Sequence, residues 1–413
     1  MSSAALLAIG DELLSGARQE TNGTFLAWHL HDAGWDVRRI ETIPDEEDRI
    51  VDALGRWIGE VDLLVLSGGL GPTHDDRTRD ALGRYLGRHL VSDPLYDRVV
   101  SRYDSEHREL LEKVRDTQSM VPEGTRAVYD PEGTALGIAF ERDGTRVLSL
   151  PGVPMEFRAM VRQELPELFV PTGGWASVVV LGVPEPLVVE RVPDVIMATD
   201  LHVSVLPSSP TVELIVRGDP ERVAEADALI RSRFDDVLPK GCRTLAEAVL
   251  HEGRRLGMTV ACAESCTGGL VQAALTDVPG SSDVFKGGIV AYSDEIKERV
   301  LGVPREILDR HGAVSRECAE AMARGALQLC GSGLAVSSTG IAGPSGATPT
   351  KPVGTVWLAV ARRTGDAVTT SASLRAIRGS RGDVRDRAVA RALTELWHAM
   401  RGAAARGEGQ HLF

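Results

Sequence analysis

Short apolar runs alternate with amphipathic segments along much of this 413-residue chain. Apolar runs that end in turn residues indicate buried strands, whereas apolar positions spaced three or four apart indicate helices. In the first part, these patterns predict strands at 4–9, 37–40, 61–66 and 147–150, and helices at 24–30 and 48–58. Strands that alternate with helices are typical of a parallel α/β sheet, which binds ligands at the carboxyl ends of its strands.

The pattern changes between about residues 172 and 239. Three β-rich runs and one helix, at 177–181, 202–206, 212–216 and 220–234, predict a small α+β module. A helix at 245–256 and strands at 258–263, 333–338 and 355–360 then return to the α/β pattern. We therefore predict the α/β fold class, with two doubly wound α/β domains at 1–170 and 241–402 joined by a small α+β module at 171–240. The aperiodic residues 403–413 are expected to form a flexible tail.

Composition and charge indicate which kinds of partner and which cellular location to expect for this protein. Hydrophobic residues make up 43% of the chain, which is enough for real cores. The formal charge of −13 argues against nucleic acid or an anionic membrane as a partner, while small anionic ligands remain compatible. Five cysteines without a CxxC pair, no signal-peptide pattern and no membrane-length apolar run predict a reduced, cytoplasmic protein.

The run AESCTGG at 263–269 follows a predicted buried strand and precedes a predicted helix. A nucleophile in such a turn is exposed at the end of a strand, near helix N–H groups that can stabilise an oxyanion. Ser265, Cys266 and Thr267 are the candidate nucleophiles. The alternative is a glycine-rich connection that merely packs.

Downstream, a predicted strand ends at Tyr292, and a helix that begins at Ser293 and Asp294 carries Lys297 in its first turn. A serine nucleophile needs a base, and a buried lysine can supply one. The alternative for these two residues is a surface lysine and a core tyrosine.

Two further segments carry groups suited to a phosphate. The loop 337–346 is rich in glycine and hydroxyl groups, which suits a phosphate or carbonyl cradle. Arg381 and Arg385 lie one helical turn apart and could grip a phosphate together. Alternatively, they form an exposed basic face that pairs with Asp383 and Asp386.

Together, the ordered motifs AESCTGG, PGSS at 279–282, AYS followed by Lys297, HGAVS at 311–315, STGIAGPSG and KPVGTVW resemble the C-terminal domain of the CinA family, over about 245–397. The resemblance implies metal-free hydrolysis of nicotinamide mononucleotide to nicotinate mononucleotide and ammonia through an acyl-enzyme. It makes Ser265 the nucleophile and assigns Lys297 and Tyr292 to its activation and to proton transfer. The substrate contacts that it implies are Thr267, Gly268, Gly340, Ala342, Gly343, Arg381 and Arg385.

Cys266 is the rival nucleophile, with His311 as its conceivable base. A thiol beside a strand of small residues is often buried and inert, however, and the family assigns the chemistry to the serine.

The N-terminal part has two motifs at predicted strand ends, GDELLSG at 10–16 and SGGLGPTHDD at 67–76. They place Asp11, Glu12, Asp75 and Asp76 on one expected rim of the sheet, where carboxylates can hold a hard divalent cation that bridges phosphate oxygens. Each acidic pair taken alone could equally cap a helix.

With GTALG at 133–137 and LPGVP at 150–154, these motifs resemble the molybdopterin-binding fold in its CinA variant, over about 4–170. The resemblance implies a metal-dependent ADP-ribose pyrophosphatase that releases AMP and ribose 5-phosphate. Two positions depart from the family pattern: Leu136 interrupts the usual GTAPG, and Arg115 replaces a common Asn. The implied metal ligands are Asp11, Glu12, Asp75, Asp76 and Glu156, and the implied substrate contacts are Asn22, Gly68, Gly69, Gly71 and Thr73.

The sequence thus predicts a two-activity enzyme of pyridine-nucleotide salvage, with nucleotide substrates and a homodimeric state suggested by the family. One alternative keeps only the deamidase active and makes the N-terminal domain a nucleotide- or pterin-binding module. Another, suggested by the family name, is a non-catalytic partner in competence or damage response.

Overall fold

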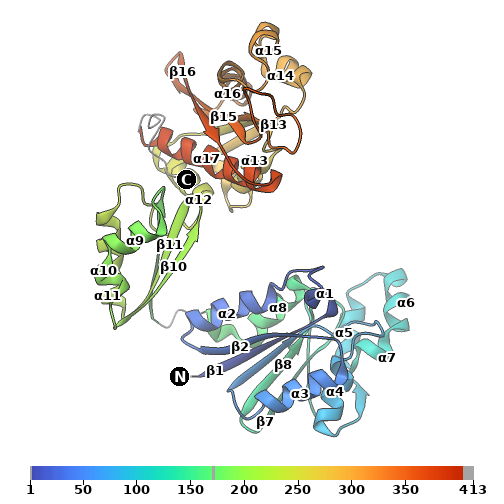
Figure 1. Cartoon of the computed structure of the whole chain (residues 1–413). Helices are drawn as coiled ribbons and strands as arrows, with labels where there is room; N and C mark the ends of the chain where they lie inside the picture. Colours follow the sequence, from blue (N-terminus) through green and yellow to red (C-terminus); the bar gives the residue numbers. More distant parts are fainter. Residues whose placement is uncertain (1, 170–172, 403–413) are drawn as a thin grey trace. The chain divides into compact units, whose positions relative to one another are not determined.

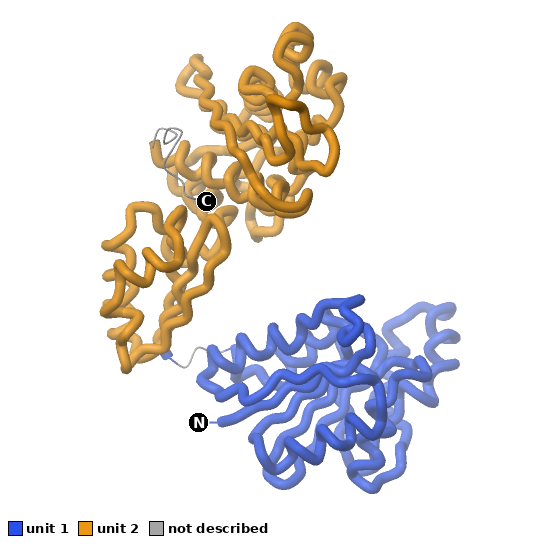
Figure 2. Tube along the Cα trace, in the orientation of Figure 1, with its two compact units in different colours: residues 1–173 blue, residues 174–413 orange. Residues whose placement is uncertain are grey.

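The computed structural model describes residues 2–169 and 173–402, so the predicted tail at 403–413 lies outside the described residues. The chain forms two compact units, Met1–Gly173 and Gly174–Phe413 (Figure 2).

A six-stranded sheet forms the centre of the first unit (Figure 1). Its first four neighbouring strands are parallel: β2 (Asp36–Ile43), β1 (Ser3–Ile9), β3 (Leu63–Ser67) and β8 (Thr145–Leu150). Two antiparallel strands, β7 (Gly137–Arg142) and β6 (Arg126–Val128), complete the sheet. Every residue of β1 is buried, as expected for a strand covered on both faces.

Helices cover both faces of this sheet. On one face, α2 (Asn22–Asp32) and α8 (Pro154–Glu164) share a core with β1, β3 and β8. On the other face, α3 (Glu47–Trp57) and α4 (Thr78–Leu86) build a second core. The remaining elements of this unit are α1 (Asp11–Leu14), β4 (Leu90–Ser92), α5 (Leu95–Ser101), α6 (Ser105–Lys113), α7 (Arg115–Gln118), β5 (Met120–Pro122) and the 3-10 helix η1 (Pro166–Phe169).

The second unit begins with the small α+β module that the sequence predicted. Its antiparallel sheet has the order β10 (Leu201–Ser208), β11 (Thr211–Gly218), β9 (Gly174–Leu181), and α11 (Pro220–Arg233) packs on it. Two short helices, α9 (Glu185–Arg191) and α10 (Pro193–Ile196), follow β9. The boundaries predicted between this module and its neighbours stay predictions.

A five-stranded sheet follows in the same unit, in the order β13-β12-β14-β15-β16. The strands β13 (Phe285–Val290), β12 (Val260–Glu264) and β14 (Leu334–Gly340) are parallel, whereas β15 (Thr355–Thr364) and β16 (Ala367–Ala376) are antiparallel. One core contains residues of α12 (Leu245–Leu256), α13 (Leu270–Thr276) and α17 (Arg381–Met400). A second core contains residues of α16 (Arg316–Cys330), α14 (Asp294–Leu301) and α15 (Arg305–His311), and η2 (Ser281–Asp283) precedes β13.

The predicted fold class is confirmed, but several strands differ from the prediction. The antiparallel strands β6 and β7 were not predicted. The strand β16 was not predicted, because its apolar positions alternate with small and hydroxyl residues that give little signal. The strand β13 ends at Val290 rather than at Tyr292. Within 2–169 and 173–402, no helix combines the length and the apolar character needed to cross a membrane.

Candidate active site

A cavity of about 240 Å³ opens at the carboxyl end of β12 and brings together residues from five stretches of the sequence. It is lined by Ser265, Cys266, Tyr292, Asp294, Lys297, Ala313, Val314, Thr339, Gly340, Ala342 and Arg381. The three residues predicted to be catalytic, Ser265, Lys297 and Tyr292, therefore face one space although 32 positions separate the first from the last of them in the sequence.

Ser265 sits directly after the buried strand β12 and is 9% exposed. Its backbone N–H donates to the carbonyl of Ser338 at 2.9 Å, and its own carbonyl accepts from the N–H of Gly268 at 3.1 Å. Gly268 and Gly269 have φ values of 63° and 99°, in the left-handed region that favours glycine. The chain can therefore turn sharply from β12 into α13 while the serine stays at the cavity wall.

Glu264 fixes the other side of this turn. Its buried carboxylate accepts hydrogen bonds from the N–H groups of Gly269, Val271 and Gln272 at 2.9, 3.0 and 2.9 Å. These donors at the start of α13 are thereby satisfied, so they are not free for the oxyanion role expected of the helix N-terminus. This cap could not be predicted from the sequence, because a carboxylate before Ser265 resembles any polar strand end.

The alternative of a surface lysine and a core tyrosine is wrong for Lys297 and Tyr292, because the lysine is buried and the tyrosine is exposed. The lysine side chain is 1% exposed, whereas the tyrosine is 62% exposed. The lysine Nζ donates to the backbone carbonyl of Tyr292 at 3.2 Å and lies 3.8 Å from Oδ1 of Asp294. A buried amine that lines the same cavity as a serine is compatible with a serine–lysine pair.

Arg381 and Arg385 contact different parts of the site. Arg381 donates to the carbonyl of Gly343 at 2.8 Å and to the hydroxyl of Tyr292 at 3.1 Å. Arg385 donates to the carbonyl of Thr267 at 3.1 Å and does not line the cavity. Arg381 is thus the arginine of this pair that lines the cavity, while Arg385 contacts the turn that follows Ser265.

The other predicted contacts divide in the same way. Gly340 and Ala342 line the cavity. Thr267 is fully buried, its hydroxyl lies 2.6 Å from that of Ser338, and it does not line the cavity. Four lining positions lay outside the predicted set: Asp294, which the sequence suggested only as a helix start, Thr339, and the pair Ala313 and Val314 in the HGAVS motif.

The rival pair of Cys266 and His311 finds little support. Burial raises the pKa of the Cys266 thiol to about 11, so the sulfur is protonated near neutral pH. His311 does not line the cavity, and its Nδ1 lies 3.6 Å from Oε2 of Glu317.

In the first unit, Asn22 links the strand ends at which the glycine loop begins. Its side-chain amide donates to the hydroxyl of Ser67 and to the carbonyl of Gly152, both at 2.9 Å. Its Oδ1 is buried and has no hydrogen-bond partner among the described residues. Gly68 has a φ of 113°, and a Cβ there would lie 2.2 Å from the carbonyl oxygen of Ile9, so only glycine fits.

The predicted metal ligands separate into three groups. The Asp76 carboxylate accepts from the N–H of Gly71 at 2.8 Å and from the N–H and hydroxyl of Thr73 at 2.9 and 2.5 Å, so it stabilises its own loop. Asp11, Glu12 and Asp75 lie near Asp45, whose pKa is raised by burial and by the negative charges of these three carboxylates.

Glu156 belongs to a different pair. Its carboxyl lies beside that of Asp130, a fully buried residue, and burial together with the Asp130 charge raises the Glu156 pKa to about 7. In the described part of the chain, no three His, Cys, Asp or Glu side chains are grouped so that they could hold a metal ion. The five implied ligands therefore do not fit a ready-made metal site in this arrangement.

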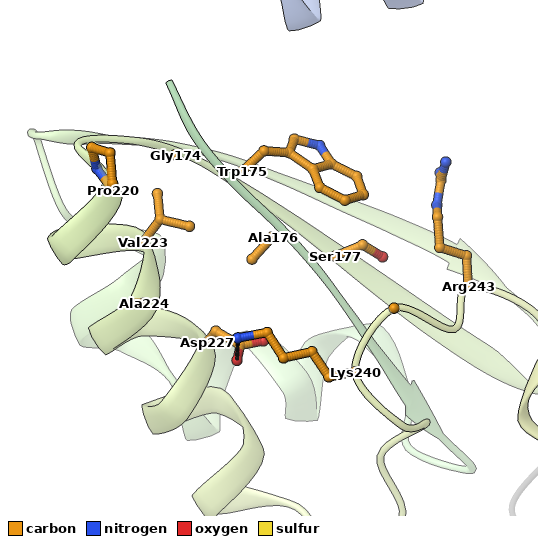
Figure 3. A pocket seen from close by; sticks show the side chains of 11 residues that line it. Gly174, Trp175, Ala176, Ser177, Pro220, Val223, Ala224, Asp227, Lys240 and Arg243 are labelled. Carbon is orange, nitrogen blue, oxygen red and sulfur yellow. Dashed lines mark ion pairs between the residues drawn. The ribbon is translucent and has the colours of Figure 1, made fainter. Parts of the chain in front are cut away.

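A second cavity, of about 380 Å³, lies in the small module between the start of β9 and α11 (Figure 3). Apolar side chains such as Trp175 and Val223 line much of it. Its charged residues are engaged with carboxylates: Lys240 with Asp227 at 3.5 Å, and Arg243 with Glu213 at 2.7 Å. None of the predicted site residues lines it.

Both parts of the chain are similar to known proteins. The family model for the CinA C-terminal domain matches residues 242–400, and that for a probable molybdopterin binding domain matches residues 5–169. A CinA-like protein of Chlorobium phaeovibrioides is 39% identical over 433 residues, with 99% of this chain and all of that protein covered. A putative competence-damage inducible protein of Symbiobacterium thermophilum is also 39% identical, over 94% of this chain and 97% of its own length. The crystal structure of the competence/damage inducible protein CihA from Agrobacterium tumefaciens is 43% identical over 38% of this chain and 93% of that chain, with a TM-score of 0.36.

Proposed function

This chain belongs to the CinA family, and from that premise we propose that its C-terminal domain hydrolyses nicotinamide mononucleotide to nicotinate mononucleotide and ammonia. The observation that carries the proposal is the buried amine of Lys297, which shares one cavity with Ser265. A lysine taken out of water, in the same cavity as a serine, is suited to act as its general base.

The proposed reaction has two steps. In the first, the Ser265 hydroxyl gives its proton to Lys297, its oxygen attacks the carboxamide carbon, and the C–N bond breaks as the nitrogen leaves as ammonia. In the second, water attacks the resulting ester, and nicotinate mononucleotide leaves as Ser265 regains its proton. Tyr292, on the same cavity, is placed to pass protons between the amine and the leaving nitrogen.

The 5′-phosphate of the substrate would meet Arg381 at the mouth of this cavity. The guanidinium is bound to a backbone carbonyl and a phenol, both of them neutral groups, so its charge is available to an anion. Gly340 and Ala342 are small enough to let the nucleotide approach the loop backbone.

The test is release of ammonia from nicotinamide mononucleotide by the intact chain, measured with and without a metal chelator. We expect turnover that survives chelation, because the Ser265, Lys297 and Tyr292 chemistry needs no metal. Failure to release ammonia from this substrate would contradict the proposal.

A second candidate activity, hydrolysis of ADP-ribose to AMP and ribose 5-phosphate, belongs to the first unit. The observation that favours it is the unpartnered Asn22 Oδ1 beside the glycine loop, on a unit that also gathers Asp11, Glu12, Asp45 and Asp75. Because the implied ligands do not form a ready-made metal site, a nucleotide- or pterin-binding module remains the alternative for this unit.

One measurement distinguishes a pyrophosphatase from a binding module in the first unit. AMP release from ADP-ribose with added divalent metal, lost on chelation and in Asp11→Ala, supports the pyrophosphatase. Saturable nucleotide binding without product supports the binding module.

A further inference from the structure

The amine of Lys297 lies close to one carboxylate that the serine–lysine reaction does not itself use. Oδ1 of Asp294 is 3.8 Å from Nζ of Lys297, and both side chains line the cavity of Ser265. The two environments differ, since the lysine side chain is 1% exposed and that of the aspartate is 55% exposed. One end of this ion pair is therefore buried at the reacting centre, and the other reaches solvent.

Other polar groups around the amine carry no negative charge at neutral pH. Tyr292 offers its backbone carbonyl, and its hydroxyl accepts from the cationic Arg381. On α16, which packs against α14, the thiol of Cys318 interacts electrostatically with Lys297, but burial raises its pKa to about 11 and keeps it protonated. Among the described residues, Asp294 is thus the carboxylate found within ion-pair distance of this amine.

We propose that Asp294 is a positioning residue for Lys297, a role that rests on the proposed deamidase function. Its Oδ1 holds the amine at the cavity, and its charge stabilises the ammonium that forms when the Ser265 proton moves to Nζ. The positive charge on Lys297 develops while the serine oxygen attacks the carboxamide carbon. The attraction of Asp294 for this charge therefore grows toward the transition state. This is the part that a third group plays in orienting the base of a nucleophile–base pair.

Two variants separate orientation from charge. Asp294→Asn keeps an oxygen acceptor and removes the charge, whereas Asp294→Ala removes both. Glu295→Gln is the matched control, since Glu295 is also an acidic residue in the first turn of α14 but pairs with Arg299 at 3.2 Å. The readouts are kcat for ammonia release from nicotinamide mononucleotide and the pH profile of kcat/KM, with thermal unfolding to show that each variant folds.

We expect Asp294→Asn to lower kcat roughly tenfold, since an exposed partner leaves only part of the Coulomb energy of a 3.8 Å pair. Without the carboxylate, the positive charge near Ser265 loses its counter-charge, so the acidic limb of the profile should move to lower pH. Asp294→Ala also frees the amine to move and should lower kcat roughly 100-fold. Glu295→Gln should leave both readouts unchanged.

The proposal is overturned if both Asp294 variants match Glu295→Gln in kcat and in pH profile. It is also overturned if they lose activity without any movement of the acidic limb, because a purely structural role would do that. Failure of the proposed function is a separate result, in which the intact chain releases no ammonia.

Discussion

The guanidinium of Arg381 donates one hydrogen bond to the hydroxyl of Tyr292, at 3.1 Å, and another to the carbonyl of Gly343, at 2.8 Å. The start of α17 is thereby joined to the loop before α14 and to the loop after β14. Three segments far apart in the sequence therefore meet at Arg381, a lining residue of the cavity and the residue proposed to bind the substrate phosphate.

Removal of this cation should weaken the binding of phosphorylated substrate. We expect Arg381→Ala to raise KM for nicotinamide mononucleotide roughly 10- to 100-fold, the value of a charge-assisted hydrogen bond. Nicotinamide riboside, which lacks the phosphate, should be processed about equally by the variant and the intact chain. Arg387→Ala on the same helix is the control, and an equal loss with both substrates would show that Arg381 does not bind phosphate.

The protonated state of Cys266 leads to a prediction about the rival nucleophile. Its pKa of about 11 leaves almost no thiolate at neutral pH, and the residue is only 6% exposed. We therefore expect Cys266→Ala to keep kcat within roughly threefold of the intact value, and iodoacetamide to react slowly with this position at pH 7.5. Loss of ammonia release in this variant, with the fold intact, would return the chemistry to the thiol.

More of the fold than of the candidate site could be predicted from the sequence. Continuous apolar runs identified β1, β3, β12 and β14, because strands covered on both faces have few polar positions. The spacing of apolar residues could not predict that Lys297 is buried and Tyr292 exposed. A lysine in the first turn of a helix usually reaches water, and its burial here depends on how α14 packs against α16.

Contacts that depend on tertiary packing were also beyond the sequence. Asp130 and Glu156 are far apart in the chain, and their meeting beside Gly133 depends on where α8 begins after β8. The motif around Asp76 indicated a metal ligand, whereas the carboxylate binds its own loop through Gly71 and Thr73. The residue types of Asp76 and Glu156 suggested metal ligands, whereas the backbone geometry determines which groups these two carboxylates contact.

The cap made by Glu264 should matter for stability. Glu264→Ala leaves three N–H groups at the start of α13 without their acceptor, which we expect to lower the free energy of unfolding by about 3 kcal/mol. Thr244→Ala removes the more exposed cap of α12 and should cost about 1 kcal/mol. Urea unfolding of both variants gives the comparison, and a loss for Glu264→Ala no greater than that for Thr244→Ala would contradict the role assigned to this carboxylate.

The carboxyl pair in the first unit makes stability depend on pH. The Glu156 pKa rises from 4.5 in the unfolded chain to about 7 in the fold, so the folded state holds its proton more tightly. Below pH 4.5, the Glu156 carboxyl is protonated in both the folded and the unfolded chain, so it does not lower the free energy of unfolding. As the pH rises toward 7, the unfolded state releases its proton first, and stability falls by at most about 3 kcal/mol.

Glu156→Gln removes this penalty, because the amide carries no charge and can donate to Asp130. We expect slower hydrogen exchange in first-unit peptides of the variant at pH 8, and no difference from the intact chain at pH 4. The exposed Glu109→Gln serves as the control. An equal effect of Glu156→Gln at both pH values would show that the carboxyl is not protonated in the fold.

The most direct test of the account is the turnover of nicotinamide mononucleotide by Ser265→Ala. The variant should bind the substrate and keep the unfolding transition of the intact chain, while kcat for ammonia release falls by at least about 10³-fold, because the attacking oxygen is gone. Near-normal ammonia release by folded Ser265→Ala would contradict the assignment of the nucleophile and, with it, the proposed mechanism.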